Sequence, residues 1–202
     1  AGFMIVSSPA NVLKRAPLGF ANAALDYSQL GGIYGRPKKI LLSRTLSYLG
    51  IWGIYFPFTG EANVNIAIPA SQLPSTVCHE MAHQRGFARE DEANFIAYLV
   101  TKYHPDIEFK YSGSLLALVH GMNALKVQNP EAFQVIQAKY GPGLKKDLAE
   151  VSNFSLHHQG TAEELATKIN NYYLKANNQR EGINSYGRMV DLLLAEYRGI
   201  PH

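Results

Sequence analysis

The pattern of hydrophobic and polar positions predicts an N-terminal helix, a few short strands, and then helices to the end of the chain. Residues 8–30 are mostly helix-forming, and Pro17 is expected to kink this helix. Residues 38–43 and 50–58 are short runs rich in apolar or aromatic side chains, and each is a candidate strand. Residues 62–68 alternate strictly between two faces, which is typical of a half-buried strand.

The alternating strand also predicts which side chains face the core. One face would hold Ala62, Val64, Ile66 and Ile68, and the other Asn63, Asn65 and Ala67. The second face is polar but carries no charge. We therefore expect this strand at an exposed edge of the sheet.

Helical periodicity dominates the rest of the chain. The predicted helices cover residues 69–86, 90–104, 114–125, 130–140, 143–151, 161–176 and 185–197. We expect an α+β fold, mostly α, in a single domain over residues 1–202. Its sheet and site helices would lie in residues 1–110 and a helical part in residues 111–202.

Composition limits the classes of function. The chain has 202 residues, 47% hydrophobic and 17% charged, which fits a globular protein. Its formal net charge of +3 comes without a basic stripe, which argues against nucleic acid as the main partner. The longest nearly apolar run, residues 48–58, is too short to span a bilayer. Because the chain begins at Ala1 without Met, we expect a processed or excised piece, in which a signal peptide or membrane segment upstream would not be visible.

The candidate chemistry is concentrated in one predicted helix. His79, Glu80 and His83 form a His-Glu-x-x-His sequence. Residues four apart on a helix share a face, so both imidazoles can reach one ion. Glu80 would stand beside the ligands, where it can touch a water molecule on that ion without ligating it. The pattern favours a Zn²⁺ site, and the competing interpretation is two surface histidines on an ordinary helix.

A catalytic zinc needs a third protein ligand. A histidine six residues after His83 would supply one, but that position is Arg89. Gly86 is expected to end the first helix, because it tolerates the left-handed backbone of a C-cap. The chain would then restart as a helix within residues 89–95, with three carboxylates in its first turn.

Among these carboxylates we expect Glu92 to be the ligand, because it precedes the apolar periodic run of the second helix. Asp91 is the main alternative. Glu90 and Asp91 are otherwise expected to favour the helix N-terminus electrostatically. Arg85 and Arg89 are expected to pair with these acids.

The segment HEMAHQRGFAREDEANFIAYL resembles the zincin metallopeptidases of the gluzincin kind, whose second helix supplies a glutamate ligand. With GIYFPFTGEANVNIAIP, YSGSLLALVHGMNAL and YLKANNQREGINSYGRMVDLLLA, the wider chain resembles the bacterial family DUF3810. The resemblance implies a zincin-like fold and membrane anchoring through N-terminal segments missing from this chain. It also implies an edge strand that pairs with an extended substrate, for which Asn63 and Asn65 are the candidate binding residues.

Other polar residues have mainly structural interpretations. His120 is expected to be a core histidine or to support the site without ligating, and Cys78 a buried small hydrophobe. Tyr186 and Arg188 are mostly structural candidates, although either could steady an oxyanion above the metal.

These features together predict a zinc-dependent peptidase that acts on a peptide or protein, with Glu80 as general base. The alternative is a sensor or scaffold domain that keeps zinc without turnover. Glu80 favours the enzyme, since a purely structural site needs no carboxylate there. We expect the full-length protein to be membrane-anchored, with this domain outside the cytoplasm.

Overall fold

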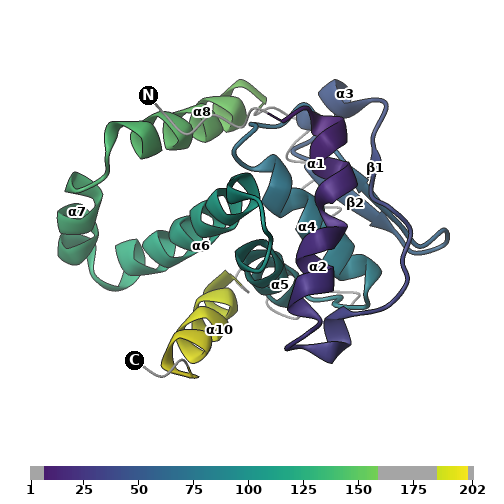
Figure 1. The fold of residues 1–202 in the computed structure, drawn as a ribbon. Coiled ribbons are helices and arrows are strands. Elements are labelled where there is room, and N and C mark those ends of the chain that lie inside the picture. The colour runs from purple at the N-terminus through teal and green to yellow at the C-terminus, as the bar shows by residue number, and fades with distance from the viewer. Residues whose placement is uncertain (1–6, 159–185, 200–202) are drawn as a thin grey trace.

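The computed structural model describes residues 7–158 and 186–199 (Figure 1). Helices make up most of the described chain, and a small three-stranded sheet lies near its N-terminal side. The predicted α+β class with mostly helix is therefore confirmed. None of the described helices combines the length and apolar character needed to cross a bilayer.

The predicted N-terminal helix is divided in two. Helix α1 spans Pro9–Arg15 and α2 spans Pro17–Ala23. The side chain of Ser8 caps α1 by accepting a hydrogen bond from the backbone N–H of Asn11. Pro17 begins the second helix, because a proline fits the first turn, where its missing N–H has no partner to lose. A 3₁₀ turn, Ser28–Leu30, follows.

The sheet contains β1 (Lys38–Lys39), β2 (Gly53–Phe56) and β3 (Glu61–Val64) in the order β1-β3-β2. Strand β3 pairs parallel with β1 and antiparallel with β2. The expectation that the alternating strand forms an exposed edge is therefore wrong, because β3 is the middle strand. Strand β2 lies at an edge of the described sheet. Helix α3, Ser43–Ser47, begins in the segment where a longer first strand was predicted.

Strand β3 ends earlier than its alternation suggests, and Asn65 gives the reason. Its side chain is fully buried and donates to Ser47 Oγ at 3.0 Å and to the Ile51 carbonyl at 2.9 Å. Its Oδ1 accepts from the backbone N–H of Ala67 at 2.9 Å, an Asx turn that bends the chain out of the sheet. Asn65 therefore anchors the connection and does not face solvent as predicted.

The helices that carry the candidate site are α4 (Leu73–Gln84) and α5 (Glu90–Lys102). Helix α4 packs against β2, β3, α5 and α6, so it lies at the centre of the molecule (Figure 1). Apolar side chains of α4 and α5 are buried between these elements, including Val77, Cys78, Met81, Ala82, Ala93, Ala97 and Val100. This packing fixes the rotation of both helices about their axes.

Three further helices, α6 (Ile107–Gln128), α7 (Pro130–Ala138) and α8 (Pro142–His158), follow one another along an arc (Figure 1). The last described helix, α10 (Tyr186–Gly199), packs against α5 and α6. The helix predicted over residues 161–176 lies outside the described residues.

Candidate metal centre

Helix α4 presents His79 and His83 on one face because its other faces are committed to the core. Pro74 lies in the first turn, and the helix ends at Gln84 with Arg85 as C-cap. Gly86 follows with a φ of +93°, a left-handed conformation that glycine adopts without strain, as the sequence predicts. The chain then turns back, and α5 begins beside the two mostly buried imidazoles.

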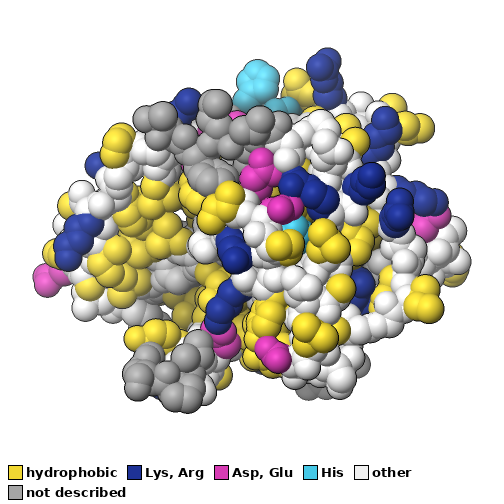
Figure 2. All heavy atoms as spheres, viewed as in Figure 1, with side chains coloured by type: hydrophobic (Ala, Val, Ile, Leu, Met, Phe, Trp, Pro, Cys, Tyr) yellow, Lys and Arg dark blue, Asp and Glu magenta, His cyan; other side chains and the backbone are white. Residues whose placement is uncertain are grey.

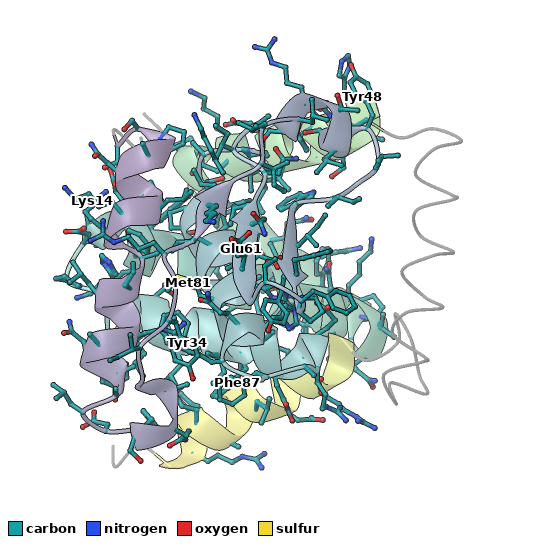
Figure 3. All side chains as sticks on the ribbon, turned by 90° about the vertical axis from the view of Figure 1, so that its right-hand side faces the viewer. Lys14, Tyr34, Tyr48, Glu61, Met81 and Phe87 are labelled. Carbon is teal, nitrogen blue, oxygen red and sulfur yellow. The ribbon has the colours of Figure 1, made fainter. Side chains whose placement is uncertain are left out.

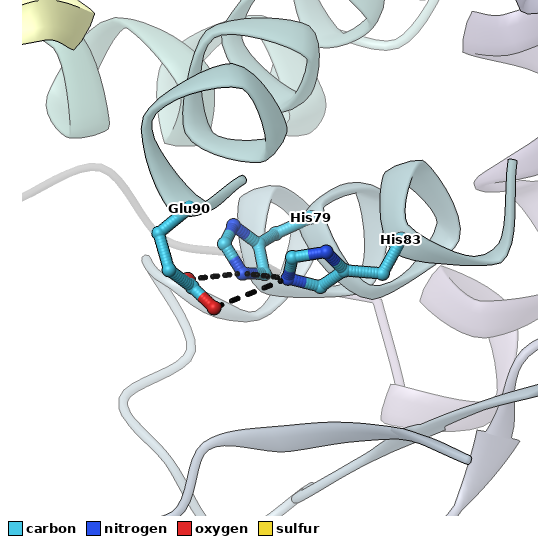
Figure 4. A group of neighbouring side chains, drawn as sticks. All are labelled: His79, His83 and Glu90. Atoms are coloured by element: carbon cyan, nitrogen blue, oxygen red, sulfur yellow. Dashed lines mark hydrogen bonds and ion pairs between the residues drawn. The ribbon is translucent and has the colours of Figure 1, made fainter. Parts of the chain in front are cut away.

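Three side chains converge at this point (Figure 4). The Nε2 atoms of His79 and His83 are 3.0 Å apart. Glu90 Oε2 lies 3.2 Å from His79 Nε2, and Glu90 Oε1 lies 3.4 Å from His83 Nε2. Two imidazoles and a carboxylate thus direct one ligand atom each toward a common point.

This arrangement fits a tetrahedral zinc. Bonds of about 2.0–2.2 Å to nitrogen and oxygen place tetrahedral ligand atoms about 3.3–3.6 Å apart. The two nitrogens are 3.0 Å apart, and each lies 3.2 or 3.4 Å from a different oxygen of Glu90, so the separations are close to that range. Two histidines and one carboxylate also form a donor set that leaves a fourth position for water or substrate.

The hydrogen-bond partners of Nδ1 in each imidazole determine whether Nε2 is free to bind a metal. His83 Nδ1 lies 2.8 Å from the Phe87 carbonyl oxygen. A carbonyl only accepts, so Nδ1 carries the hydrogen and Nε2 keeps its lone pair for the cluster. His79 Nδ1 is buried and finds no hydrogen-bond partner among the described residues. Asn94, one turn after Glu90 on α5, is near enough to raise the pKa of His79.

The charges in the cluster stabilise one another. Burial lowers the pKa of His79, but the Glu90 carboxylate, with smaller contributions from Glu80 and Asn94, raises it to about 9. Burial alone would raise the pKa of Glu90, but the two imidazoles hold it well below its ordinary value. Without a metal, these shifts favour a charge pair between His79 and Glu90.

Glu80 lies beside the cluster but does not belong to it. Its side chain is 6% exposed, and burial raises its pKa while the charges on His79 and His83 oppose the shift. The backbone of Tyr55 on β2 also acts to lower the pKa of this carboxylate. At Gly53, a side-chain Cβ would come within 2.4 Å of Glu80 Oε1. Strand β2 therefore forms one wall around Glu80.

The structure places Glu90, and not Glu92, with the two histidines. The Glu92 side chain is 45% exposed and lies 3.6 Å from Arg89 Nε. Residues two apart on a helix point about 200° apart, so Glu92 cannot share the face of Glu90. Asp91, the alternative ligand, is buried and forms a two-pronged ion pair with Arg89 at 2.8 and 3.1 Å.

Arg85 does not pair with the acids, contrary to expectation. It donates to the carbonyl oxygens of Leu30 and Met81, and its guanidinium stacks on Phe20 and Tyr34. It therefore secures the end of α4 against the N-terminal elements.

The remaining predicted site residues lie apart from the cluster or lack a described side chain. Asn63 Nδ2 donates to the Glu61 carbonyl oxygen within β3. The side chain of Tyr186 lies outside the described part of the structure. Burial lowers the pKa of His120 on α6 to about 4, and the nearby charge of His79 contributes to this shift. Cys78 is fully buried, as predicted, burial raises the pKa of its thiol to about 12, and it is not part of the His79, His83 and Glu90 group.

The protein is a mostly helical α+β protein in which two histidines and a glutamate lie close enough to hold a metal ion. The family model DUF3810, described as a protein of unknown function, matches residues 5–194. The chain therefore belongs to the DUF3810 family. No curated protein and no solved structure matched the chain.

Proposed function

We propose that this protein is a zinc-dependent peptidase, with zinc held by His79, His83 and Glu90. The observation that carries the proposal is the convergence of three ligand atoms beside a buried fourth carboxylate, Glu80, that is not one of them. A closed structural zinc site has no use for such a carboxylate, whereas hydrolysis needs a general base next to the metal. The zincin-like resemblance of the motif supports the same proposal.

When bound, the zinc would polarise the scissile carbonyl and lower the pKa of a water molecule. Glu80 then accepts a proton from the attacking water molecule while the oxygen of that water bonds to the carbonyl carbon. The protonated Glu80 delivers that proton to the amine nitrogen as the C–N bond breaks. Its burial suits this role, because a carboxylate with a raised pKa releases the proton less readily and can hold it between the two steps.

We further propose that an extended substrate pairs with β2 and not with β3. The backbone N–H of Asn65 donates to the Trp52 carbonyl oxygen at 2.9 Å. With the observed register, this bond determines which residues of β2 direct their backbone groups toward β3 and which direct them away. The backbone N–H and C=O groups of Gly53 and Tyr55 therefore point away from β3, toward the free edge of β2. The close approach of Gly53 to Glu80 supports this choice of strand. Main-chain pairing there would bind peptides with little dependence on sequence.

The test is digestion of a peptide library by the zinc-loaded chain. Glu80→Gln should retain zinc and lose activity by about 10²- to 10⁴-fold, because the proton acceptor is gone. The matched control is Glu150→Gln on the exposed side of α8, which should match the parent.

Membrane anchoring of the full-length protein remains part of the proposal, so the same comparison belongs in cells that carry it. Identical cleavage products in parent and Glu80→Gln strains would contradict catalysis by this site. They would instead favour the sensor or scaffold interpretation, in which zinc is held without turnover.

A further inference from the structure

The segment that joins β1 to α3 exposes two consecutive leucines. Leu41 is 88% exposed and Leu42 is 68% exposed. Neighbouring side chains of the same segment, such as Pro37 and Ser43, are buried, so the backbone here is held against the protein. The leucines therefore project from a fixed support, and the fold itself makes no use of their apolar surface.

Cations flank these leucines on both sides. Residues 36–44, RPKKILLSR, contain four basic residues and no acidic one. Lys39 and Arg44 are exposed immediately before and after the apolar positions, and Lys38 pairs with Glu61 on β3. Figure 2 shows Lys and Arg side chains intermingled with hydrophobic ones on the upper right of the molecule, with few acidic side chains among them.

Folding brings a further cation to this face. Helix α1 packs against β1, and its Lys14 is exposed. Figure 3 turns this side toward the viewer, with Lys14 on α1, Glu61 on the sheet, and Tyr48 beside α3. Tyr48 is half exposed, so an aromatic side chain also borders the surface. The cations of this surface thus come mainly from residues 36–44, and folding adds Lys14 from α1.

Lys39 and Arg44 also line an open hollow of about 490 Å³ beside the leucines. Its remaining walls include Leu41, Leu42, Ile66 and Ala67. The hollow therefore combines an apolar lining with two cationic side chains at its border. This combination is complementary to a lipid, in which a phosphate headgroup is joined to an acyl chain.

We propose that this face, centred on residues 39–44, docks on an anionic lipid bilayer. Leu41 and Leu42 enter the boundary between headgroups and acyl chains, while Lys39 and Arg44 contact lipid phosphates. Two leucines are too little apolar area for a stable protein interface, which buries about 800 Å² on each partner. Nucleic acid would use the cations but would leave the paired leucines in water.

The experiment is co-sedimentation of the 202-residue chain with vesicles of phosphatidylcholine containing about one third phosphatidylglycerol, and with phosphatidylcholine alone. Binding is expected only to the anionic vesicles, and it should fall at high salt, which screens the charges. Lys39→Gln with Arg44→Gln should weaken binding about 20- to 30-fold, since each surface cation contributes about fivefold. Leu41→Ser with Leu42→Ser should weaken it by more than about tenfold.

Matched controls are Lys145→Gln with Lys146→Gln on α8, and Leu25→Ser after α2, all at exposed positions. These variants should bind like the parent. Because residues 1–6 also include apolar side chains, the comparison between variants carries the test. Equal binding to neutral vesicles, or binding that survives both loop double variants, would overturn the proposal. Preferential binding of single-stranded DNA over anionic vesicles would overturn it as well.

Discussion

Gly53 on β2 leaves the space that the Glu80 carboxylate occupies on α4. A Cβ built on Gly53 would lie 2.4–2.6 Å from the Oε1, Cγ and Cδ atoms of Glu80, far closer than real contacts allow. The edge strand and the candidate general base are thus in direct contact. A side chain at residue 53 must displace either the strand or the carboxylate.

Gly53→Ala is therefore expected to reduce peptide cleavage while zinc binding persists. A displacement of about 1 Å in a catalytic group can cost about 10²-fold in rate. The measurement is cleavage of a library-derived peptide alongside zinc content. Gly121→Ala on α6, where an added Cβ meets nothing within 4 Å, is the control. Full activity in Gly53→Ala would show that Glu80 needs no fixed position against β2.

Asn94 is expected to hold the imidazole of His79 in its ligating orientation. The buried Nδ1 of His79 lacks a hydrogen-bond partner among the described residues, and Asn94 is the amide that lies nearby on α5. Loss of such a supporting group typically weakens metal affinity about 10- to 100-fold. Asn94→Ala should show this loss in a competition titration with a chelator, while Asn94→Asp should retain tight binding. Parent-like affinity in Asn94→Ala would rule out the supporting role.

Zinc affinity should rise with pH between about 7 and 9. In the metal-free protein Glu90 raises the pKa of His79 to about 9, so below that pH a proton occupies the nitrogen that zinc needs. Each pH unit in this window should strengthen binding about tenfold, and the slope should vanish above the pKa. Chelator competition at several pH values, corrected for the chelator's own protonation, measures the slope. A flat profile would mean that His79 is already neutral at pH 7.

The sequence predicts the helix with the two histidines and its end, because these depend on local rules. The four-residue spacing places His79 and His83 together, and Gly86 adopts the left-handed backbone expected after the helix. The strand order was beyond such rules, because β1 is only two residues long and its parallel pairing with β3 joins distant segments. In the described sheet β3 is therefore the middle strand, and β1 and β2 lie at the two edges.

The sequence did not predict Glu90 as the carboxylate beside the two histidines, for a related reason. The apolar run after Glu92 indicates a packed helix, but it does not show which face of α5 meets α4. That face is marked by fully buried Ala93 and Ala97, small side chains that let two helices approach closely. Glu90 stands one turn before them, so the spacing of small residues was the available signal.

The identity of the carboxylate that joins the two histidines is the most direct test of the proposed zinc site. The measurement is zinc per chain, by elemental analysis after dialysis, for the parent, Glu90→Gln and Glu92→Gln. The parent and Glu92→Gln should each hold about one zinc, because Glu92 faces Arg89. Glu90→Gln should lose most of its zinc, since its carboxylate contacts both imidazoles. Loss of zinc in Glu92→Gln with retention in Glu90→Gln, or no zinc in the parent, would contradict the site.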